Sequence, residues 1–482
     1  MIDIGSNSVR LVIYRIDGRA MIPALNEKVM PALGRELMTT GSLPQDGASD
    51  AIGALKRFAA IIAAREIERV DVVATAAVRA ARDGDAFVAR VRAETGFEVR
   101  IIPGEEEARL SALGVLAGAP DAHGIVGDLG GASLELIEIR AKGPGRGESF
   151  PLGPFALLHA SYDRERVVPR IDAVLARADM LPNVGGDFYA VGGAWRALAR
   201  IHMGIHDYPL PTLHHLEMRR REVLDTAALV QQMSRRQLEK MDEAAARRAD
   251  SMPFAAAVLE RVMLRGGFDR VIISSYGLRE GVLYEQIPAS TRALHPLIAS
   301  AEAFGERGFG GRAFGRALGA WIEPLFAERS EVFGRTRDPL LRGAASRLAD
   351  ISGMLHPDQR KDLSFELALL APIVGLSHPE RAFLAASVHH RYTKREPMHP
   401  SFKRLLNEEA RQGAFALGAA LRLGADVSAR SEALLAKFRI EMRDGTLALA
   451  PAPDATGLVS DQARKRLETL GAALGAPIRV ID

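Results

Sequence analysis

Two short stretches of the chain share a pattern of residues that could bind phosphate. Segments 3–11 and 128–136 both read Asp-x-Gly-x-x-Ser-x-x-Leu, with an apolar strand entering and another leaving. At such a turn, glycine lets the backbone approach an anion, hydroxyl and amide groups donate hydrogen bonds, and the leading aspartate can hold a metal ion or water beside the phosphate. One copy alone would more often be an ordinary hairpin, but a repeat with matching offsets is hard to obtain by chance. The candidate phosphate-binding residues are Ser6, Asn7 and Ser8 in the first copy, and Gly130, Gly131, Ala132 and Ser133 in the second.

Alternating apolar strands and helices surround both hairpins. This alternation predicts two α/β halves, each built around one hairpin, so that the two turns form a cleft. A Gly-Gly turn follows a short strand in the second half, and its Gly193 is a further candidate for phosphate binding. The first half is predicted to hold a helix at 46–67, strands at 70–75 and 97–102, and a helix that opens with Glu105-Glu106-Glu107. The second half is predicted to hold strands at 124–127, 189–191 and 271–275 and a long polar helical stretch at 216–248.

The last third of the chain has a different pattern. From about residue 300 to 435 strand signals disappear, and Ala, Leu and Arg recur with helical periodicity. Short strand patterns follow at 438–442, 446–449 and 477–481, around an Asp444-Gly445 turn. A chain of 482 residues is also too long for a single core. We therefore predict three domains, at residues 1–122, 123–285 and 286–482, the third mostly helical with a small β element.

Composition limits the class of protein. The hydrophobic content of 48% and charged content of 26% are typical of a globular protein, and no apolar run approaches the roughly 20 residues of a membrane span. We expect a cytoplasmic protein with no membrane partner. The absence of Cys excludes disulfides, thiolate zinc sites and cysteine nucleophiles. The net charge is only +3, so attraction to polyanions requires local clusters of basic residues. The first strand begins almost at Met1, and we expect the natural N-terminus to lie further upstream.

Six motifs in order along the chain resemble the exopolyphosphatase and guanosine pentaphosphate phosphohydrolase (Ppx/GppA) family. The resemblance covers essentially the whole chain and implies two ribonuclease-H-like domains of the actin, sugar kinase and Hsp70 type, followed by a helical region. Members that resemble this chain cleave the terminal phosphate from long-chain polyphosphate, from pppGpp or from both, with Mg²⁺. The motifs are Asp3-Ile4-Gly5-Ser6-Asn7-Ser8, Ala74-Thr75-Ala76-Ala77-Val78-Arg79, Pro103-Gly104-Glu105-Glu106-Glu107-Ala108-Arg109, Asp128-Leu129-Gly130-Gly131-Ala132-Ser133-Leu134-Glu135, Val191-Gly192-Gly193 with Arg196, and Ser275-Tyr276-Gly277-Leu278-Arg279-Glu280-Gly281.

The resemblance also implies roles for individual residues. It makes Glu107 the general base, places Asp128 and Glu135 beside the metal, and gives phosphate binding to residues that include Arg79. Hydrolysis of a phosphoanhydride needs such a base to take a proton from the attacking water, and donors around the phosphoryl oxygens. For each of the three glutamates in the first turn of a helix, the alternative is a favourable interaction with the helix dipole, which we keep for Glu105 and Glu106.

Spacing supports some of these roles. Asp128 and Glu135 are seven residues apart across a hairpin, so both carboxylates could approach one hard cation; alternatively, Glu135 faces solvent. Arg79 follows a strand end, where a guanidinium can grip phosphate with two hydrogen bonds. Arg279 and Glu280 are expected to form a structural pair.

The helical region resembles HD phosphohydrolases, but Ala349-Asp350 stands where that family has a His-Asp pair. We therefore expect a noncatalytic module, although His356, His378, His389 and His390 lie nearby in the sequence. Residues 389–404 are strongly basic, and such a run is either a solvated face or a groove for polyphosphate. No aromatic-interleaved sheet or reading helix accompanies it, so we predict no specific nucleic-acid partner. The candidate polyanion-binding residues are Arg391, Lys394, Arg395, Lys403 and Arg404.

The leading hypothesis is an exopolyphosphatase that acts on linear polyphosphate with Mg²⁺. Three alternatives remain open at this point: a pppGpp phosphohydrolase, an ATP-dependent kinase or actin-like ATPase of the same fold, and a regulator that binds polyphosphate or an alarmone without hydrolysing it. Ala132 in place of a third glycine and Leu134 in place of a hydroxyl residue keep the last alternative open. The resemblance and the apolar helical faces also predict a homodimer.

Overall fold

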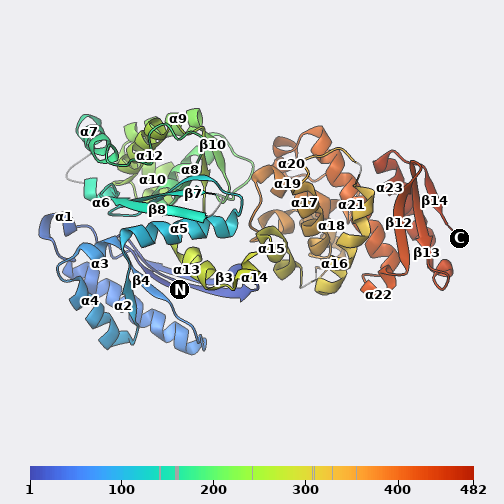
Figure 1. Ribbon diagram of the computed structural model, residues 1–482, viewed down its shortest axis with the longest axis horizontal. Helices are drawn as coiled ribbons and strands as arrows, with labels where there is room; N and C mark the ends of the chain where they lie inside the picture. The colour runs from blue at the N-terminus through green and yellow to red at the C-terminus, as the bar shows by residue number, and fades with distance from the viewer. Residues whose placement is uncertain are drawn as a thin grey trace. The chain divides into compact units, whose positions relative to one another are not determined.

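The computed structural model describes residues 1–140, 143–157, 162–241, 243–306, 308, 310–327, 329–353 and 355–481. The chain forms two compact units (Figure 1). The N-terminal unit comprises Met1–Ile16 and Met21–Arg292, and the C-terminal unit comprises Asp17–Ala20 and Ala293–Asp482. Each unit is described separately below.

The N-terminal unit contains two sheets of the same topology. The first has the strand order β3-β2-β1-β4-β5, and the second has β8-β7-β6-β9-β11 with β10 added at its edge. In both, a strand pairs antiparallel with the next strand of its hairpin on one side and parallel with a later strand on the other. This repeated order confirms the predicted duplicated ribonuclease-H-like fold. The strands are β1 Ile2–Ile4, β2 Val9–Asp17, β3 Ala20–Val29, β4 Val72–Ala74, β5 Val99–Ile101, β6 Gly124–Leu129, β7 Leu134–Arg140, β8 Gly143–Phe150, β9 Asp187–Val191, β10 Glu217–Arg219 and β11 Arg270–Ile273.

Helices cover these sheets because their apolar stripes need burial. Ile52, Leu55 and Phe58 on one face of α2 pack into the core of the first sheet, as their spacing predicts. The helices of this unit are α1 Leu37–Thr40, α2 Gln45–Ala64, α3 Ala76–Ala80, α4 Gly84–Thr95, α5 Gly104–Gly118, α6 Pro154–Leu157, α7 Arg164–Leu175, α8 Gly193–Ile205, α9 Arg220–Gln232, α10 Arg235–Met241, α11 Glu243–Ala246, α12 Met252–Gly266, α13 Leu278–Gln286 and α14 Ala289–Arg292.

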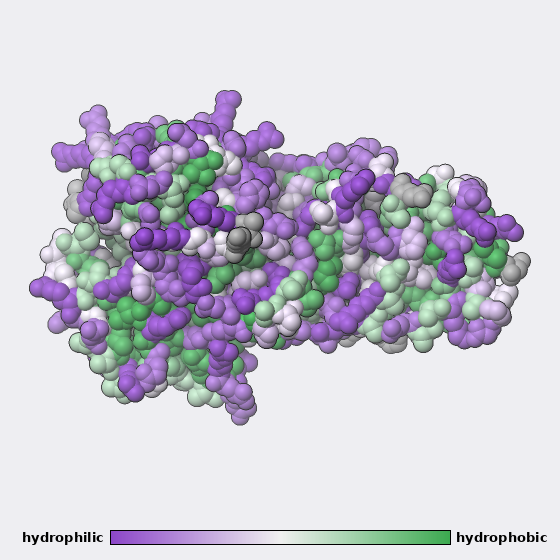
Figure 2. All heavy atoms as spheres, in the orientation of Figure 1, coloured by the Kyte–Doolittle hydropathy of each residue, from purple (hydrophilic) through white to green (hydrophobic). Residues whose placement is uncertain are grey.

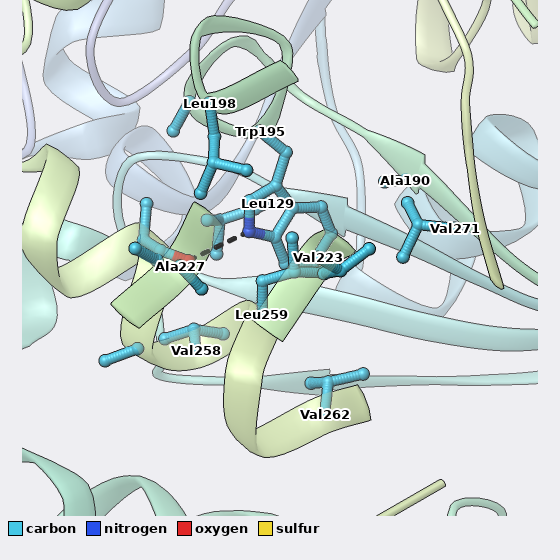
Figure 3. Packing of buried hydrophobic residues seen from close by; sticks show 14 of the residues in the cluster. Leu129, Ala190, Trp195, Leu198, Val223, Ala227, Val258, Leu259, Val262 and Val271 are labelled. Atoms are coloured by element: carbon cyan, nitrogen blue, oxygen red, sulfur yellow. Dashed lines mark hydrogen bonds between the residues drawn. The ribbon is translucent and has the colours of Figure 1, made fainter. Parts of the chain in front are cut away.

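The second sheet has the larger core. Figure 3 shows Trp195 of α8 enclosed by apolar side chains that include Leu129, Val223 and Leu259. The indole N–H donates to the Ala255 carbonyl at 3.0 Å, so the one polar atom of this buried ring is satisfied. This core fixes the N-terminal end of α8, where the Gly-Gly turn lies, against the hairpin strand that ends at Leu129.

Two helices connect the halves. Helix α5 follows the first sheet but packs its small residues against β6, β7 and β8 of the second, whereas α13 follows the second sheet and packs beside Met1 and Val73 of the first. The two helices approach very closely: a Cβ on Gly281 would lie 1.7 Å from the Leu110 carbonyl oxygen, and one on Gly114 would lie 2.1 Å from the Gly277 carbonyl oxygen. Only glycine allows this contact, in which the first turn of α13 lies against the middle and the end of α5.

Part of the predicted secondary structure is wrong. The stretch 216–248 is not one long helical segment: it begins with strand β10, because alternating Glu217-Met218-Arg219 pairs antiparallel with β11, and it continues as separate helices. Strands β3 and β8 were not predicted. The glycines and polar residues of β8 give little local strand signal, and its antiparallel pairing with β7 decides its conformation.

The C-terminal unit is helical with a small three-stranded sheet of order β12-β13-β14, as predicted. The Asp444-Gly445 turn joins β12 and β13, and β14 pairs parallel with β13. Its elements are α15 Pro296–Gly305, α16 Gly311–Ile322, a 3₁₀ turn Glu323–Leu325, α17 Arg337–Leu348, α18 Pro357–Leu370, α19 His378–His390, α20 Pro400–Leu405, α21 Glu408–Ser428, α22 Glu432–Leu435, β12 Phe438–Arg443, β13 Thr446–Pro451, a 3₁₀ turn Thr456–Leu458, α23 Asp461–Leu474 and β14 Ile478–Val480.

Polar and apolar side chains are mixed over the face seen in Figure 2, in both units. In the ranges given above, no helix combines the length and apolar content that crossing a bilayer requires.

Replacing one buried arginine of the C-terminal unit, Arg381, is expected to lower the stability of that unit. Arg381 on α19 donates to the carbonyls of Leu369 and Ala371 at 3.0 Å and to that of Ile373, and burial lowers its pKa to about 10. Arg381→Met would leave these three carbonyls without their donor. We expect a loss of at least about 3 kcal/mol of unfolding free energy, or on the order of 6–12 °C in the melting temperature of this unit, measured by calorimetry.

Arg335 provides the matched control for that substitution. Its side chain is 88% exposed and, within the described ranges, pairs with Glu331 one turn away, so Arg335→Met should change stability by less than about 0.5 kcal/mol. Equal melting temperatures for the two variants would show that the three carbonyls do not depend on Arg381.

Candidate active site

The two hairpins have the same local geometry. In the first, the Gly5 N–H donates to the Ser8 carbonyl at 3.0 Å; in the second, the Gly130 N–H donates to the Ser133 carbonyl at 2.9 Å. Both turns therefore close over the same number of residues. The shared sequence pattern thus corresponds to one shared backbone structure.

The hairpin loops converge within the N-terminal unit. A Cβ on Gly131 would lie 3.1 Å from the Ser6 Cβ and 3.1 Å from the Phe155 ring, so a side chain at position 131 would separate the loops. The backbone N–H of Phe155 donates to the Gly131 carbonyl and that of Gly34 to the Ser6 carbonyl, both at 2.8 Å. Each hairpin loop is thus hydrogen-bonded to a segment that follows it in the chain. Glycine at position 131 is needed for the close approach of the two loops.

A cavity of about 170 Å³ lies where the loops meet, and we call it the catalytic cavity. The predicted residues that line it are Ser6, Asn7, Ser8, Glu107, Asp128, Gly130, Gly131, Ser133 and Gly193. Arg79, Ala132 and Glu135 are not among its lining residues. Ala132 instead packs against Gly153, where a Cβ would come within 2.5 Å of its backbone atoms.

Glu107 lies in the first turn of α5 and is only 7% exposed. Arg79 Nη1 donates to its Oε2 at 3.0 Å and to the Ile102 carbonyl at 2.6 Å. Burial, followed by the negative charge of Glu135, raises the pKa of Glu107 well above the ordinary value, whereas Arg79 opposes the shift. A buried carboxylate with a raised pKa, facing the cavity, is a competent acceptor for a proton from water.

Asp128 and Glu135 are direct partners across the second hairpin, so their side chains lie on the same face of the sheet. The Ser111 hydroxyl donates to Asp128 Oδ2 at 2.5 Å, and the Ser149 hydroxyl donates to Glu135 Oε1 at 2.7 Å. Glu135 is 1% exposed, which excludes the alternative of a solvent-facing side chain. Burial raises the pKa of Asp128, and that of Glu135 to about 7, since both carboxylates lack solvent around their charged forms.

The oxygen donors of these two carboxylates fit a hard divalent cation such as Mg²⁺. Glu135 Oε2 is buried and makes no hydrogen bond of normal geometry with the described part of the chain. Within that part, no three His, Asp or Glu side chains are grouped to enclose a metal ion by themselves. Mg²⁺ is usually bound by one or two carboxylates and completes its shell with water and phosphate oxygens, so two adjacent acids are a sufficient protein contribution.

Basic residues that were not predicted to bind phosphate also line the catalytic cavity. Arg279 lies 3.6 Å from Asp3, and Glu280, which was expected to pair with it, accepts hydrogen bonds from the Tyr14 hydroxyl at 2.5 Å and the Gly277 N–H at 3.0 Å. Arg279 and Arg196 belong to the family motifs, and that signal could have identified them. Lys28 and Arg248 lie outside the motifs. The unpredicted basic residues are Arg10, Lys28, Arg196, Arg248 and Arg279.

The basic run at 389–404 presents fewer charges than its sequence suggests. His389 and His390 end helix α19 in a buried position, and burial lowers the pKa of His390 to about 4, which keeps it neutral. The Arg391 side chain is 11% exposed and lies 3.5 Å from buried Asp350, which also lies 3.4 Å from Arg430. The remaining predicted polyanion-binding residues, Lys394, Arg395, Lys403 and Arg404, are exposed.

The sequence matches two known families in chain order. The family described as Ppx/GppA phosphatase matches residues 12–290, and the one described as exopolyphosphatase, C-terminal, matches residues 328–481. Exopolyphosphatase 1 of Mycobacterium tuberculosis is 26% identical over 326 residues, which are 65% of this chain and 94% of that protein. The guanosine-5'-triphosphate,3'-diphosphate pyrophosphatase of Photobacterium profundum is 28% identical over 302 residues, 59% of this chain and 58% of that protein.

Solved structures agree with these matches. A Ppx/GppA family member from Aquifex aeolicus superposes with a TM-score of 0.52 and 25% identity, covering 59% of this chain and 96% of that one. An exopolyphosphatase from Cytophaga hutchinsonii has a TM-score of 0.55 at 24% identity, with the same coverage, and supports the fold. Because the first family match alone spans more than half of the residues, this chain belongs to the Ppx/GppA phosphatase family, whose members hydrolyse phosphoanhydride bonds.

Proposed function

We propose that this protein is an exopolyphosphatase that releases terminal orthophosphate from linear inorganic polyphosphate. The observation that carries the proposal is that two hairpins of the same pattern and turn geometry meet at one cavity, which the buried carboxylate of Glu107 also lines. One loop from each half can hold the terminal phosphoryl group, because both turns offer backbone N–H groups and hydroxyls to its oxygens. The related exopolyphosphatase 1 of Mycobacterium tuberculosis supports the substrate assignment, because the match covers 94% of that protein.

In the proposed mechanism, Glu107 accepts a proton from the attacking water. The water oxygen then bonds to the terminal phosphorus, the anhydride bond on its opposite side breaks, and the shortened chain leaves with the bridging oxygen. Arg79 contacts both Glu107 and the Ile102 carbonyl, and we assign it the role of holding this carboxylate in position. Its predicted contact with phosphate stays a prediction. Ser133 and the hairpin N–H groups compensate the charge on the phosphoryl oxygens.

We assign Mg²⁺ to Asp128 and Glu135. When bound there, the ion would neutralise charge on the phosphate oxygens that it shares with these two carboxylates. Ser111 and Ser149 each donate to one of the two acids and thereby fix the orientation of the ligands.

Release of the terminal 5'-phosphate of pppGpp is the second candidate activity. The Photobacterium relative supports it, but the alignment covers only 58% of that protein. The reacting group is the same in both substrates, namely a terminal phosphoryl on an anhydride, so the catalytic cavity serves either reaction. Any preference between polyphosphate and pppGpp must therefore come from residues that contact the remainder of the substrate.

The test is orthophosphate release by the purified full chain from long-chain polyphosphate, tripolyphosphate, pppGpp and ATP, with Mg²⁺ and with excess chelator. We expect the highest kcat/KM on long-chain polyphosphate and loss of activity with chelator. A higher kcat/KM on pppGpp would select the second activity. Absence of release from every substrate, with the protein folded, would overturn both.

A further inference from the structure

A second cavity of about 580 Å³ adjoins the catalytic cavity, and we call it the basic cavity. The two share the lining residues Arg10, Lys28, Gly193, Arg196, Arg248 and Ser275 and therefore lie side by side. The acids Asp3, Glu107 and Asp128 line only the catalytic cavity. Among the described side chains that line the basic cavity, Glu243 is the one acid, and it pairs with Arg247. The cations lining the basic cavity are Arg10, Lys28, Arg196, Arg200, Arg247 and Arg248.

Three parts of the fold bring these cations together. Arg10 and Lys28 come from strands β2 and β3 of the first sheet. Arg196 and Arg200 are four residues apart on α8 and therefore lie on one side of that helix. Arg247 and Arg248 follow α11 directly. Arginines from both halves of the N-terminal unit thus surround one opening, which is the arrangement expected for a polyanion site.

The α8 N-terminus adds to this positive field. A Cβ on Gly193 would lie 2.8 Å from Arg248 Nη2, so the guanidinium stands directly over the first turn of the helix. A helix N-terminus carries partial positive charge, so this end of α8 and the Arg248 guanidinium both attract an anion.

The half-buried cations are stabilised poorly when no anion is present. Burial, followed by the charges of Arg248, Arg10 and Arg196, lowers the pKa of Lys28 to about 7. Burial and the charges of Arg279 and Arg10 likewise lower the pKa of Arg196 to about 10. A solvated surface cluster would spread its charges into water, whereas these side chains converge on a shared space, which indicates a site for negative charge.

We propose that the basic cavity binds the non-terminal phosphates of the substrate, next to the phosphoryl group under attack. This inference rests on the proposed function and deepens it, because it gives the N-terminal unit its own site for the substrate chain. Guanidinium groups can grip phosphates with paired hydrogen bonds, and several along one path would favour an extended chain of phosphates over a single phosphate ester. The cavity therefore determines preference for chain length.

The test is a double variant, Arg200→Gln with Arg247→Gln. Both residues line the basic cavity and neither lines the catalytic cavity. We expect KM for long-chain polyphosphate to rise by about 10- to 100-fold, since two charged contacts are lost, with kcat within about twofold. The salt dependence of log KM should also become shallower, because fewer cations neutralise phosphate. Hydrolysis of tripolyphosphate, which reaches fewer of these cations, should change less.

Two controls accompany this variant. Arg166→Gln with Arg221→Gln removes the same charge from residues that are 86% and 92% exposed, outside both cavities, and should leave KM unchanged. Lys394→Gln with Arg395→Gln tests the exposed basic run of the C-terminal unit in the same assay. If that variant raises KM for long chains and the Arg200/Arg247 variant does not, the basic cavity is not the chain site.

Further outcomes separate this inference from the proposed function. Long-chain polyphosphate should bind to Glu107→Gln protein in calorimetry, and binding should weaken when Arg200→Gln and Arg247→Gln are added. This result would support the cavity even if the unsubstituted protein hydrolysed no polyphosphate. An unchanged KM, an equal loss of kcat on every substrate, or an effect confined to pppGpp would each overturn the assignment to a phosphate chain.

Discussion

Glu107→Gln is expected to lower kcat for orthophosphate release by about 10²- to 10⁴-fold, the usual contribution of a general base, with KM within about threefold. Glutamine keeps the shape of the side chain and can still contact Arg79, but it cannot accept the proton of water. The structure supports this loss because Glu107 faces the catalytic cavity and burial raises its pKa, so the ionised form is a strong base. Steady-state release from long-chain polyphosphate, at saturating Mg²⁺, measures the effect.

Glu105 provides the matched control on the same helical turn. Its side chain is 64% exposed and lies 3.2 Å from Arg146, which is typical of a surface ion pair. Glu105→Gln should therefore retain kcat within about twofold. If Glu107→Gln also kept full activity, another group would have to take the proton, and the role assigned to Glu107 would be wrong.

The residues of the catalytic cavity could be predicted where chemistry depends on a short local pattern. The hairpins are of this kind: glycine, hydroxyl and aspartate at fixed offsets specify the turn, and Ser6 and Gly131 meet as the repeat implied. Glu107 follows a Pro-Gly break that starts a helix, and this position was also readable from the sequence. In each case the functional group and the backbone that holds it lie within about ten residues.

Lys28 and Arg248 could not be predicted in this way. Lys28 lies on β3, whose strand conformation comes from its place at the edge of the first sheet. Arg248 follows α11 and reaches the site only because its guanidinium lies over the α8 N-terminus, 55 residues earlier in the sequence. Long-range packing determines both positions, and a single sequence carries no local signal of it.

At residues 389–404 the sequence overstates the exposed positive charge. A run of Lys, Arg and His reads as one surface when only the sequence is considered. In the structure its first residues belong to the buried end of α19. There the His389 ring donates from Nε2 to the Arg395 carbonyl at 3.0 Å, and its Nδ1 lies 3.3 Å from the Ser364 hydroxyl. Helix burial thus removes part of the apparent charge.

The two connecting helices explain why acids and bases of the site come from both halves. Helix α5 carries Glu107 and packs on the second sheet, and α13 carries Arg279 and packs on the first. Their glycine contact, Gly114 against Gly277 and Gly281 against Leu110, holds the helices together, and both Glu107 and Arg279 line the catalytic cavity. A change in the packing of α5 on α13 would therefore move Glu107 relative to Arg279. The glycine contact takes no part in the reaction, but the geometry of the site depends on it.

Asp128→Asn is expected to lower activity at saturating substrate by about 100- to 1000-fold and to abolish the response to Mg²⁺, because one of the two carboxylates assigned to the ion is lost. The substitution should not unfold the protein. Burial already disfavours the charged form of Asp128, and an amide can accept the Ser111 hydrogen bond at the same position. Without Mg²⁺, the melting temperature of the variant should therefore equal or exceed that of the unsubstituted protein.

Thermal shifts separate metal loss from misfolding in this experiment. Mg²⁺ should raise the melting temperature of the unsubstituted protein in proportion to the logarithm of its concentration, and this rise should vanish in Asp128→Asn. Asp121→Asn, at an exposed position outside the catalytic cavity, is the control and should keep both the shift and the activity.

Ser149→Ala tests the same metal assignment by removing a hydrogen bond to Glu135, one of the two carboxylates assigned to the ion. The Ser149 hydroxyl holds Glu135 Oε1 at 2.7 Å, and its loss should raise the Mg²⁺ concentration for half-maximal activity by about 10- to 100-fold while high Mg²⁺ restores kcat. Such recovery would show that the serine acts through the carboxylate and not on the substrate. If Asp128→Asn retained an unchanged Mg²⁺ dependence, or if no Mg²⁺ concentration rescued Ser149→Ala, then the ion would have to bind elsewhere than at Asp128 and Glu135.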